Sequence, residues 1–339
     1  MTQTLVTGGG GFVGQHLVAA LLARGDRVRI VDLRSPERAP PGAQYVRGSI
    51  LDPALVREAL DGVEEVYHLA ALPGMWMPRK ADFHDVNCRG TEIVLAAARE
   101  RGVRRFLHCS TESILFGRAN PEPFVSERTQ TTPEEMPGAY TRSKMRAEQL
   151  ALKAAASGFP VVIANPTIPV GPHRYLTPPT EMLRYFLKRR LQVYLDFVMN
   201  LVDVRDVAAG LLLAMQHGQV GQRYILGGED ISMRRLLETL TAIGGREAVR
   251  IAMPGGIARA IAAAMEFVAD HITHRPPAAT VEGVRIALRS KPLSIEKSRR
   301  ELSYAPRPIE FALREVIAAV VAEPGMARYP SAASYKSEF

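Results

Sequence analysis

Cysteine is scarce in this chain, which has two cysteines among 339 residues. Cys88 and Cys109 form no CxxC pair, and neither has a histidine nearby at the spacing of metal ligands. Such isolated cysteines are typical of buried thiols in a reducing compartment rather than of disulfides or metal sites. We therefore expect no bound metal.

Long hydrophobic runs are also absent. The longest apolar stretch, 257–269, is interrupted by Arg259 and Glu266 and is too short to span a bilayer. Because the chain enters a predicted strand at once, we expect no signal peptide and a cytoplasmic protein. Segment 256–271 could form an apolar lid or a helix resting on a membrane surface, so peripheral membrane association remains an alternative.

Charge of one sign does not dominate any long segment, although the formal net charge is +8. Basic residues cluster only at 184–190 and 297–300, and aromatic residues do not alternate with them. A surface that binds nucleic acid usually combines both features, so we expect no nucleic-acid partner. With 47% hydrophobic and 23% charged residues, the composition is that of a globular protein with a sizeable core.

Strands and helices alternate along the first half of the chain. Apolar runs predict strands at 4–6, 28–32, 45–46, 65–69, 105–109 and 161–164. Helical spacing predicts helices at 12–23, 53–60, 87–101 and 140–156. This order predicts an α/β fold with a doubly wound parallel sheet covered by helices on both faces.

The alternation becomes irregular after about residue 170, where proline-rich loops appear. We predict a nucleotide-binding domain at 1–170, with further elements at about 200–226 returning to it. A smaller, irregular lobe at 171–330 and a frayed tail at 331–339 would follow. The expected strands and helices of this half are 202–204, 206–216, 223–226, 232–243, 256–271, 294–302 and 309–321.

A glycine-rich turn follows the first predicted strand and opens the first helix. Gly9-x-Gly11-x-x-Gly14 fits the dinucleotide fingerprint, and Gly8-x-x-Gly11-x-x-Gly14 fits a variant spacing, so both remain open. Glycine lets the backbone approach a pyrophosphate, which then meets the N-terminus of the helix. With Asp32 ending the next strand, this context predicts a Rossmann dinucleotide site.

Two side chains bear on the choice of cofactor. A carboxylate at Asp32 accepts hydrogen bonds from ribose hydroxyls and repels a 2′-phosphate, which favours NAD. Arg34 lies two residues later and could meet a 2′-phosphate. NAD is therefore the expected cofactor, and NADP is the alternative.

Tyr140 and Lys144 form a YxxxK motif within a predicted helix. Residues four apart share a helix face, and an ammonium near a phenol favours the phenolate. The pair therefore predicts Tyr140 as a catalytic acid or base whose pKa is lowered by Lys144.

These motifs together resemble the extended short-chain dehydrogenases/reductases of the NAD-dependent epimerase/dehydratase family. Later segments resemble a branch that includes hopanoid-associated sugar epimerases, dihydroflavonol reductases and 3β-hydroxysteroid dehydrogenases; they are GAY (138–140), NPTIPVGP (165–172), RYILGGE (223–229) and RPIEFALRE (307–315). The segments that carry the family resemblance are TGGGGFVG (7–14), Asp32, YHLAA (67–71), VNCRGT (86–91), YTRSK (140–144), ANPT (164–167) and NLVDVRDVA (200–208).

The resemblance implies roles for residues at matching positions. Tyr140 would shuttle the proton of the substrate hydroxyl, and Lys144 would hold the nicotinamide ribose. The family usually has an acid after the third strand, where this chain has Ser49, so adenine contacts there are less certain. The positions expected to line the cofactor are Gly8, Gly11, Phe12, Val13, Gly14, Asp32, Arg34, Ser49, Ile50, Leu69, Ala70, Ala71, Asn87, Tyr140, Lys144, Pro166, Thr167 and Ile168.

The segment HCSTESILFG (108–117) departs from the family pattern. The family's catalytic hydroxyl lies five residues before the closing glycine, and that position is Glu112 here. Three interpretations follow: Thr111 supplies the hydroxyl, Glu112 faces the substrate as an acceptor or added acid, or the protein only binds dinucleotide. Ser113 flanks Glu112 on the other side. We expect Thr111 to act.

The substrate is suggested by an apolar loop that includes Met75 and the chain's one tryptophan, Trp76. An apolar loop suits a lipid-like substrate, such as a sterol or hopanoid or a sugar-like group on one, better than a nucleotide sugar. His173 and Glu112 are the other expected substrate contacts. We expect hydride transfer between nicotinamide and a secondary alcohol or ketone; the alternatives are a nucleotide-sugar epimerase or dehydratase and a non-catalytic dinucleotide sensor. The family also implies a homodimer.

Overall fold

The computed structural model describes residues 1–33, 42–118, 121–173, 177–245 and 247–322. A seven-stranded sheet forms its centre, and every neighbouring pair of strands is parallel. The strands stand in the order β10-β6-β5-β4-β1-β2-β3, so the chain changes direction across the sheet between β1 and β4. The predicted doubly wound parallel sheet is confirmed. Its strands are β1 (Gln3–Thr7), β2 (Arg27–Asp32), β3 (Ala43–Arg47), β4 (Glu65–His68), β5 (Arg105–Cys109), β6 (Val161–Pro166) and β10 (Arg223–Leu226).

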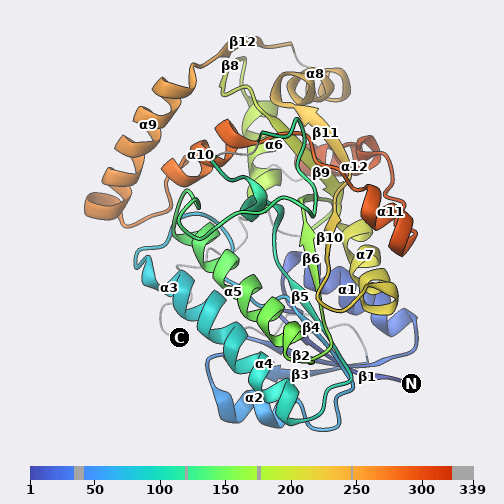
Figure 1. Ribbon diagram of the computed structural model, residues 1–339. Helices are drawn as coiled ribbons and strands as arrows, with labels where there is room; N and C mark the ends of the chain where they lie inside the picture. The colour runs from blue at the N-terminus through green and yellow to red at the C-terminus, as the bar shows by residue number, and fades with distance from the viewer. Residues whose placement is uncertain (34–41, 119–120, 174–176, 246, 323–339) are drawn as a thin grey trace.

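Helices cover both faces of this sheet (Figure 1). Helices α1 (Phe12–Ala23) and α7 (Val204–His217) contact each other on one face, while α2 (Pro53–Ala59), α4 (Gly90–Glu100) and α5 (Ala139–Ala156) contact one another on the other face. Each face has its own apolar core. Every residue of β6 is buried, as expected for a central strand with helices on both sides.

The helix expected to begin at Asn87 begins earlier. A short helix, α3 (Ala81–Phe83), leads into a π-helical turn, η1 (His84–Arg89), and α4 continues from it. An ion pair between Arg79 and Asp82 holds the start of this region. π-helical turns inside helices are frequent near functional sites.

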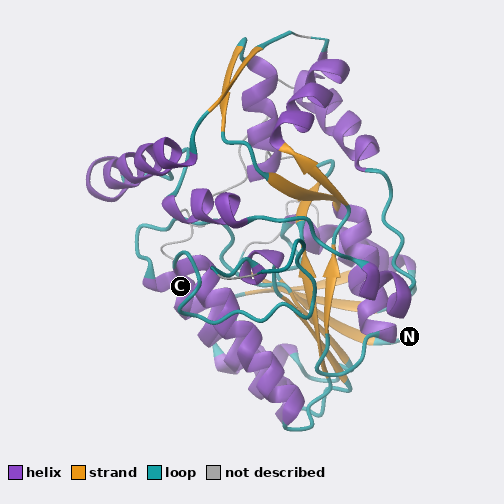
Figure 2. Ribbon diagram, turned by 45° about the horizontal axis from the view of Figure 1, so that its top comes forward, coloured by secondary structure: helices purple, strands orange, loops and turns teal. Residues whose placement is uncertain are grey.

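The C-terminal lobe contains two further sheets and several helices (Figure 2). One sheet has the order β11-β9-β7, and the other pairs β12 with β8. A third apolar core lies under α6, α8 and α12. The elements are β7 (Ile168–Val170), α6 (Pro178–Lys188), β8 (Leu191–Tyr194), β9 (Val198–Asp203), β11 (Glu229–Ser232), α8 (Met233–Gly244), β12 (Val249–Ala252), α9 (Gly255–Val268), the π-helical turn η3 (Ala269–Thr273), α10 (Val281–Arg289), α11 (Glu296–Leu302) and α12 (Ile309–Ala322).

Two helices of this lobe begin within or directly after a proline-rich stretch of the sequence. In α6, Thr177 caps the N-terminus and Pro178 occupies the first turn. In α10, Thr280 caps the helix directly after a second proline-rich stretch. Proline is well tolerated in the first turn of a helix, because the amide it lacks would have no partner within the helix. Proline therefore marked a helix start at α6 rather than only a loop.

Strand β10 joins the main sheet beside β6, so this late segment returns to the nucleotide-binding part of the chain. Strand β9 is longer than the 202–204 expected for it and lies in the smaller sheet with β7 and β11. Among the described residues, no helix is long and apolar enough to cross a membrane.

Candidate active site

The glycine-rich turn connects β1 to α1 at the carboxyl edge of the central sheet. Gly8 has φ +74°, and a Cβ added there would lie 2.7 Å from the Ala70 nitrogen. A Cβ on Gly14 would lie 2.2 Å from the Gly8 carbonyl oxygen, so α1 packs directly against the turn. The left-handed backbone at Gly8 supports the spacing that starts at Gly8.

The first turn of α1 suits a negatively charged group. Gly11 occupies the N-cap without a side-chain hydrogen bond, and the first turn holds no acidic residue. Phe12 and Val13, which were predicted to line the cofactor, thus form the start of a helix that no described side chain caps. Such a terminus, next to glycines with no room for a Cβ, fits a pyrophosphate.

Asp32 ends β2, and its Oδ2 accepts a hydrogen bond from the Gly10 amide at 3.0 Å. The predicted ribose-binding carboxylate therefore lies beside the glycine turn. Arg34 lies outside the described residues. At the next strand end, the Ser49 hydroxyl accepts from the Leu51 amide at 3.2 Å, so it supports a turn, and Ile50 is buried.

Residues after β4 form the opposite wall of the turn. The Leu69 amide donates to the Thr7 carbonyl, and the Ala70 amide donates to the Thr7 hydroxyl; Ala71 follows them. His68 contacts Thr7 and Thr91 through its two ring nitrogens, and burial lowers its pKa to about 3. The imidazole is therefore neutral and structural.

The predicted nicotinamide-side residues lie where β6 ends and β7 begins. Pro166 ends β6, the Thr167 amide donates to the Leu226 carbonyl, and Ile168 starts β7. The Thr167 hydroxyl is buried and has no hydrogen-bond partner among the described residues. A buried hydroxyl of this kind fits a polar ligand group placed at the strand ends.

Tyr140, Thr111 and Lys144 come together at the carboxyl end of β5. The Thr111 side chain lies near enough to the Tyr140 phenol to lower its pKa. The Lys144 ammonium is buried one helical turn further along α5 and donates to the Cys109 carbonyl at 2.8 Å. Of the three residues considered for the catalytic role, Thr111 is the one whose hydroxyl lowers the pKa of the phenol, and its catalytic role stays a prediction.

The pKa of Tyr140 departs from the expectation. Burial raises this pKa strongly, and the negative charge of Glu112 raises it further, while the hydrogen bond from Thr111 partly opposes both. Burial also lowers the pKa of Lys144. The expected lowering of the Tyr140 pKa by Lys144 is therefore not seen in this arrangement, where the phenol stays protonated at neutral pH.

Glu112 is buried directly beside this pair. The Thr111 hydroxyl donates to its Oε2 at 2.9 Å and also contacts the Ser113 hydroxyl at 3.0 Å. Burial raises the pKa of Glu112 to about 7, against the opposing effect of hydrogen bonds from Thr111 and nearby backbone. Glu112 can therefore gain or lose a proton near neutral pH.

The residues predicted to contact substrate are separated in space. Trp76 is buried, and its indole donates to Asp270 at 2.7 Å, while Met75 lies against Gly283 of α10. His173 instead meets the Phe12 ring edge-on, with ring centroids 5.3 Å apart. This contact places His173 at the nucleotide end.

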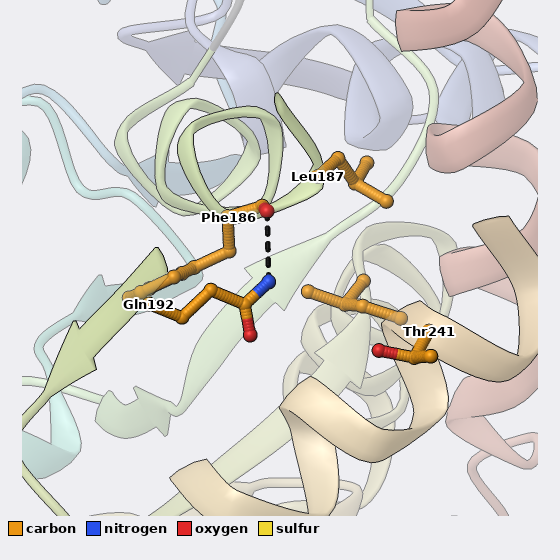
Figure 3. A pocket seen from close by; sticks show the side chains of 5 residues that line it. Phe186, Leu187, Gln192 and Thr241 are labelled. Carbon is orange, nitrogen blue, oxygen red and sulfur yellow. Dashed lines mark hydrogen bonds between the residues drawn. The ribbon is translucent and has the colours of Figure 1, made fainter. Parts of the chain in front are cut away.

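One small cavity lies between α6 and α8, away from these residues. Its walls include Phe186, Leu187, Gln192 and Thr241, and the Gln192 amide donates to the Phe186 carbonyl at 2.9 Å (Figure 3). It contains none of the predicted catalytic residues.

Residues 4–227 match the model of the NAD dependent epimerase/dehydratase family. The chain belongs to this family. The glycine turn, Asp32 and the Tyr140–Lys144 pair all lie within the matched residues, and the chain is an NAD-dependent enzyme of this family.

Relatives of this family member support the same assignment. It is 34% identical to a putative dihydroflavonol 4-reductase of Synechocystis over 92% of both chains. It is 32% identical to sterol demethylase protein B of Methylococcus capsulatus over 93% of this chain and 97% of that one. A solved structure titled gox2253 matches with a TM-score of 0.81 and 32% identity, covering 97% of this chain and all of the other.

A buried polar network surrounds the predicted catalytic residues of this epimerase/dehydratase family member. The sequence did not predict it as part of the site. The Asn165 amide donates to the Thr111 carbonyl at 3.1 Å and to the Glu148 carboxylate at 2.8 Å. Glu148 is fully buried and forms an ion pair with Arg223 of β10. Glu148 follows Lys144 by four residues on the same helix face, and this spacing in the sequence could have indicated that Glu148 lies near the site.

Asn87 links α5 to the loop after β4. Its side chain hydrogen-bonds both the amide and the carbonyl of Leu72, and its amide nitrogen donates to the Ser143 hydroxyl at 3.0 Å. The buried asparagine predicted to contact the cofactor thus holds the segment next to Lys144 in place.

Proposed function

We propose that this protein is an NAD-dependent ketoreductase in which Tyr140 is the proton donor, Thr111 positions the substrate oxygen and Lys144 holds the nicotinamide ribose. When bound, the reduced cofactor supplies the hydride that reaches the carbonyl carbon. The observation that carries the proposal is that Tyr140, Thr111 and the buried Lys144 lie together at the carboxyl end of β5, in the sheet that holds the glycine turn.

The direction of the proposed reaction follows from the protonation state of Tyr140. Because burial and Glu112 raise the pKa of the phenol, Tyr140 holds its proton at neutral pH. A protonated phenol can donate to the oxygen of a ketone as negative charge develops there. The arrangement therefore favours reduction of a ketone to a secondary alcohol.

Glu112 can return the proton that Tyr140 gives up. Its carboxyl group accepts a hydrogen bond from the Thr111 hydroxyl, and the Thr111 side chain also acts on the Tyr140 phenol. A proton can pass from the Glu112 carboxyl to the Thr111 oxygen while the Thr111 proton passes to the phenolate. With a pKa of about 7, Glu112 is partly protonated under the conditions in which this transfer is needed.

A lipid-like substrate is the proposed class. The loop with Met75 and Trp76 supplies apolar side chains and packs against α10 and η3, where Met75 meets Gly283 and the Trp76 indole donates to Asp270. Sterol demethylase protein B, a relative at 32% identity, has a sterol in its name. We propose a sterol- or hopanoid-like ketone, or a sugar-like group attached to one.

The test is turnover measured by nicotinamide absorbance at 340 nm, with a panel of polycyclic, isoprenoid and nucleotide-sugar substrates. We expect Tyr140→Phe to lower kcat by about 100-fold or more while NADH affinity stays unchanged, because only the proton donor is lost. Thr111→Ala should also lower kcat. Tyr185→Phe, at an exposed tyrosine in the other lobe, is the matched control.

The outcomes separate the alternatives. Full activity in Tyr140→Phe would contradict the proposed mechanism. Turnover of nucleotide sugars alone would favour an epimerase or dehydratase, and NADH binding without turnover across the panel would favour a dinucleotide sensor. A homodimer formed through the helices that carry Asn87 and Tyr140 is a further proposal, tested by sedimentation.

A further inference from the structure

The N-terminus of the catalytic helix α5 is capped from a distant part of the chain. Glu282 of α10 lies 142 residues after Tyr140, yet its Oε2 accepts from the Tyr140 amide at 3.2 Å. Its Oε1 accepts from the Thr141 amide and from the Thr141 hydroxyl, each at 2.7 Å. Glu282 is only 5% exposed, so these bonds form away from solvent.

The helix itself cannot supply this cap. The N-cap position is Gly138, which has no side chain to offer, and no local side chain caps the helix. A Cβ at this position would lie 2.1 Å from the Glu282 Oε2, so the glycine leaves room for the carboxylate. A negative charge here also meets the positive end of the helix dipole.

Other residues of α10 form hydrogen bonds with the segment that leads into α5. Arg285 donates to the Pro137 carbonyl at 3.1 Å, and Arg289 donates to the Glu135 carbonyl at 2.7 Å. These residues lie three and seven positions after Glu282, on the same face of α10. One helix of the C-terminal lobe therefore holds four backbone positions between residues 135 and 141, and α10 lies above α5 in Figure 1.

The same part of the lobe also holds the proposed substrate loop. The Val281 amide at the start of α10 donates to Glu266 of α9 at 3.1 Å. Asp270, just beyond α9, accepts from Trp76 at 2.7 Å and pairs with Lys80. A displacement of α9 and α10 would thus reach both the loop after β4 and the catalytic helix.

We propose that Glu282 is a positioning residue for Tyr140: it fixes the first turn of α5 and so ties the placement of the phenol to the C-terminal lobe. The proposal rests on the proposed function in that Tyr140 is the proton donor. Glu282 does not touch the reacting atoms; it acts through the Tyr140 and Thr141 amides.

The charge of Glu282 adds an electrostatic effect to this geometry. Glu282 raises the pKa of the Tyr140 phenol, as Glu112 does more strongly from the segment after β5. Burial raises the pKa of Glu282 itself, the hydrogen bonds to α5 oppose this, and Glu266 of α9 raises it further. An uncharged side chain at position 282 should therefore let the phenol lose its proton at lower pH.

The test compares Glu282→Ala and Glu282→Gln with Asp52→Ala. Asp52 caps α2 in the same way, accepting from the Ala54 and Leu55 amides, but lies far from Tyr140 in the fold. We expect Glu282→Ala to speed amide hydrogen exchange in a peptide covering 138–145, while peptides from α4 exchange as in the wild type. Glu282→Gln, which keeps one carbonyl acceptor, should restore part of the protection.

The kinetic readout is made at a temperature where all variants are folded. We expect Glu282→Ala to lower kcat by about 10- to 100-fold with little change in NADH affinity, because the phenol is misplaced. In Glu282→Gln the high-pH limb of the kcat profile should move to lower pH. Asp52→Ala should lower stability with kcat and the pH profile unchanged.

The two kinds of failure can be told apart. Unchanged exchange in 138–145, or a kcat loss in Glu282→Ala no larger than in Asp52→Ala, would overturn the role of Glu282. If the wild type reduces no ketone while exchange in 138–145 still depends on Glu282, the cap is retained and the proposed function fails instead.

Discussion

A single buried carboxyl group sets much of the chemistry proposed for this site. Glu112 occupies the position where the family's spacing places a hydroxyl, and the hydroxyl of Thr111 lies between Glu112 and Tyr140. The extra acid does not displace Thr111 from the phenol. It raises the pKa of the phenol and adds a group that titrates near neutral pH.

Glu112→Gln tests this at the residue scale. The folded carboxyl has a pKa of about 7 against 4.5 for an ordinary glutamate, so the folded state disfavours the charged form. Stability is therefore lost as pH rises from about 4.5 to 7, and the whole penalty is present above pH 7. We expect Glu112→Gln to raise the free energy of unfolding at pH 8 by roughly 3 kcal/mol at most, and by little at pH 4.5.

Urea unfolding at the two pH values measures this difference. Glu58→Gln, on the outer side of α2, is the control and should change stability equally little at both. An equal effect of Glu112→Gln at pH 4.5 and pH 8 would contradict the raised pKa. The same variant should lower kcat, since the proton that replenishes Tyr140 is removed.

At the scale of elements, the turn between β1 and α1 depends on contacts from outside it. The tight space at Gly8 is made by Leu69 and Ala70, which follow β4 and lie 61 and 62 residues after Gly8. The glycine pattern in the sequence is thus half of a site whose other wall comes from the neighbouring parallel strand.

Gly8→Ala should abolish NADH binding, because the added Cβ would lie 2.7 Å from the Ala70 nitrogen and the residue has φ +74°. Gly25→Ala is a matched control: Gly25 has φ +90°, but a Cβ there meets nothing within 4 Å. Both variants introduce backbone strain, but only Gly8→Ala places a methyl group in the space between the glycine turn and Ala70. Quenching or transfer of NADH fluorescence measures binding, and equal affinity in the two variants would count against the assignment.

At the scale of the whole molecule, α9 and η3 present an apolar stripe to the surroundings. Both acids of this region face the protein, Glu266 bonding to Val281 and Asp270 to Trp76. The outward side chains are 39–67% exposed and recur every three or four residues: Ile257, Ile261, Met265, Val268 and Ile272. The β8–β12 pair on the same side of the lobe in Figures 1 and 2 also exposes Leu191, Val193, Val249 and Ile251.

We propose an anionic membrane surface as the occupant of this stripe. The exposed residues Lys188, Arg189 and Arg190 directly precede β8, and the chain carries a net charge of +8, which complements acidic headgroups. We expect the protein to sediment with phosphatidylglycerol-containing vesicles and less with neutral ones. Ile261→Glu with Ile272→Glu should remove this binding.

Phe311→Glu is the control, because Phe311 is 60% exposed but lies on α12. Two outcomes would contradict the membrane contact. In one, the wild-type protein binds neither kind of vesicle. In the other, the stripe holds two copies of the chain together, so that Ile261→Glu with Ile272→Glu yields a monomer.

The order of elements followed from the sequence because each depends on local pattern. Strand β5 and strand β10 have the bounds expected for them, and α1 begins and ends as predicted. The glycine turn, Asp32 and the Tyr140–Lys144 spacing are local as well, so they predicted the cofactor, which the family confirms, and the catalytic helix, which stays a prediction. Of the predicted site residues, Arg34 lies outside the described residues, and so does the predicted tail at 331–339.

Contacts between distant segments were decided by the tertiary structure. Sequence spacing left Thr111 and Glu112 as competing candidates, because one residue of register reverses the direction of a side chain on an extended chain. Folding brings the side chains of Thr111 and Glu112 near the phenol and joins them by a hydrogen bond, and it brings Glu282 to a helix end 142 residues away. The reason is physical: helices and strands are selected by neighbours along the chain, whereas the pKa of a buried group depends on charges and burial that only the packed fold creates.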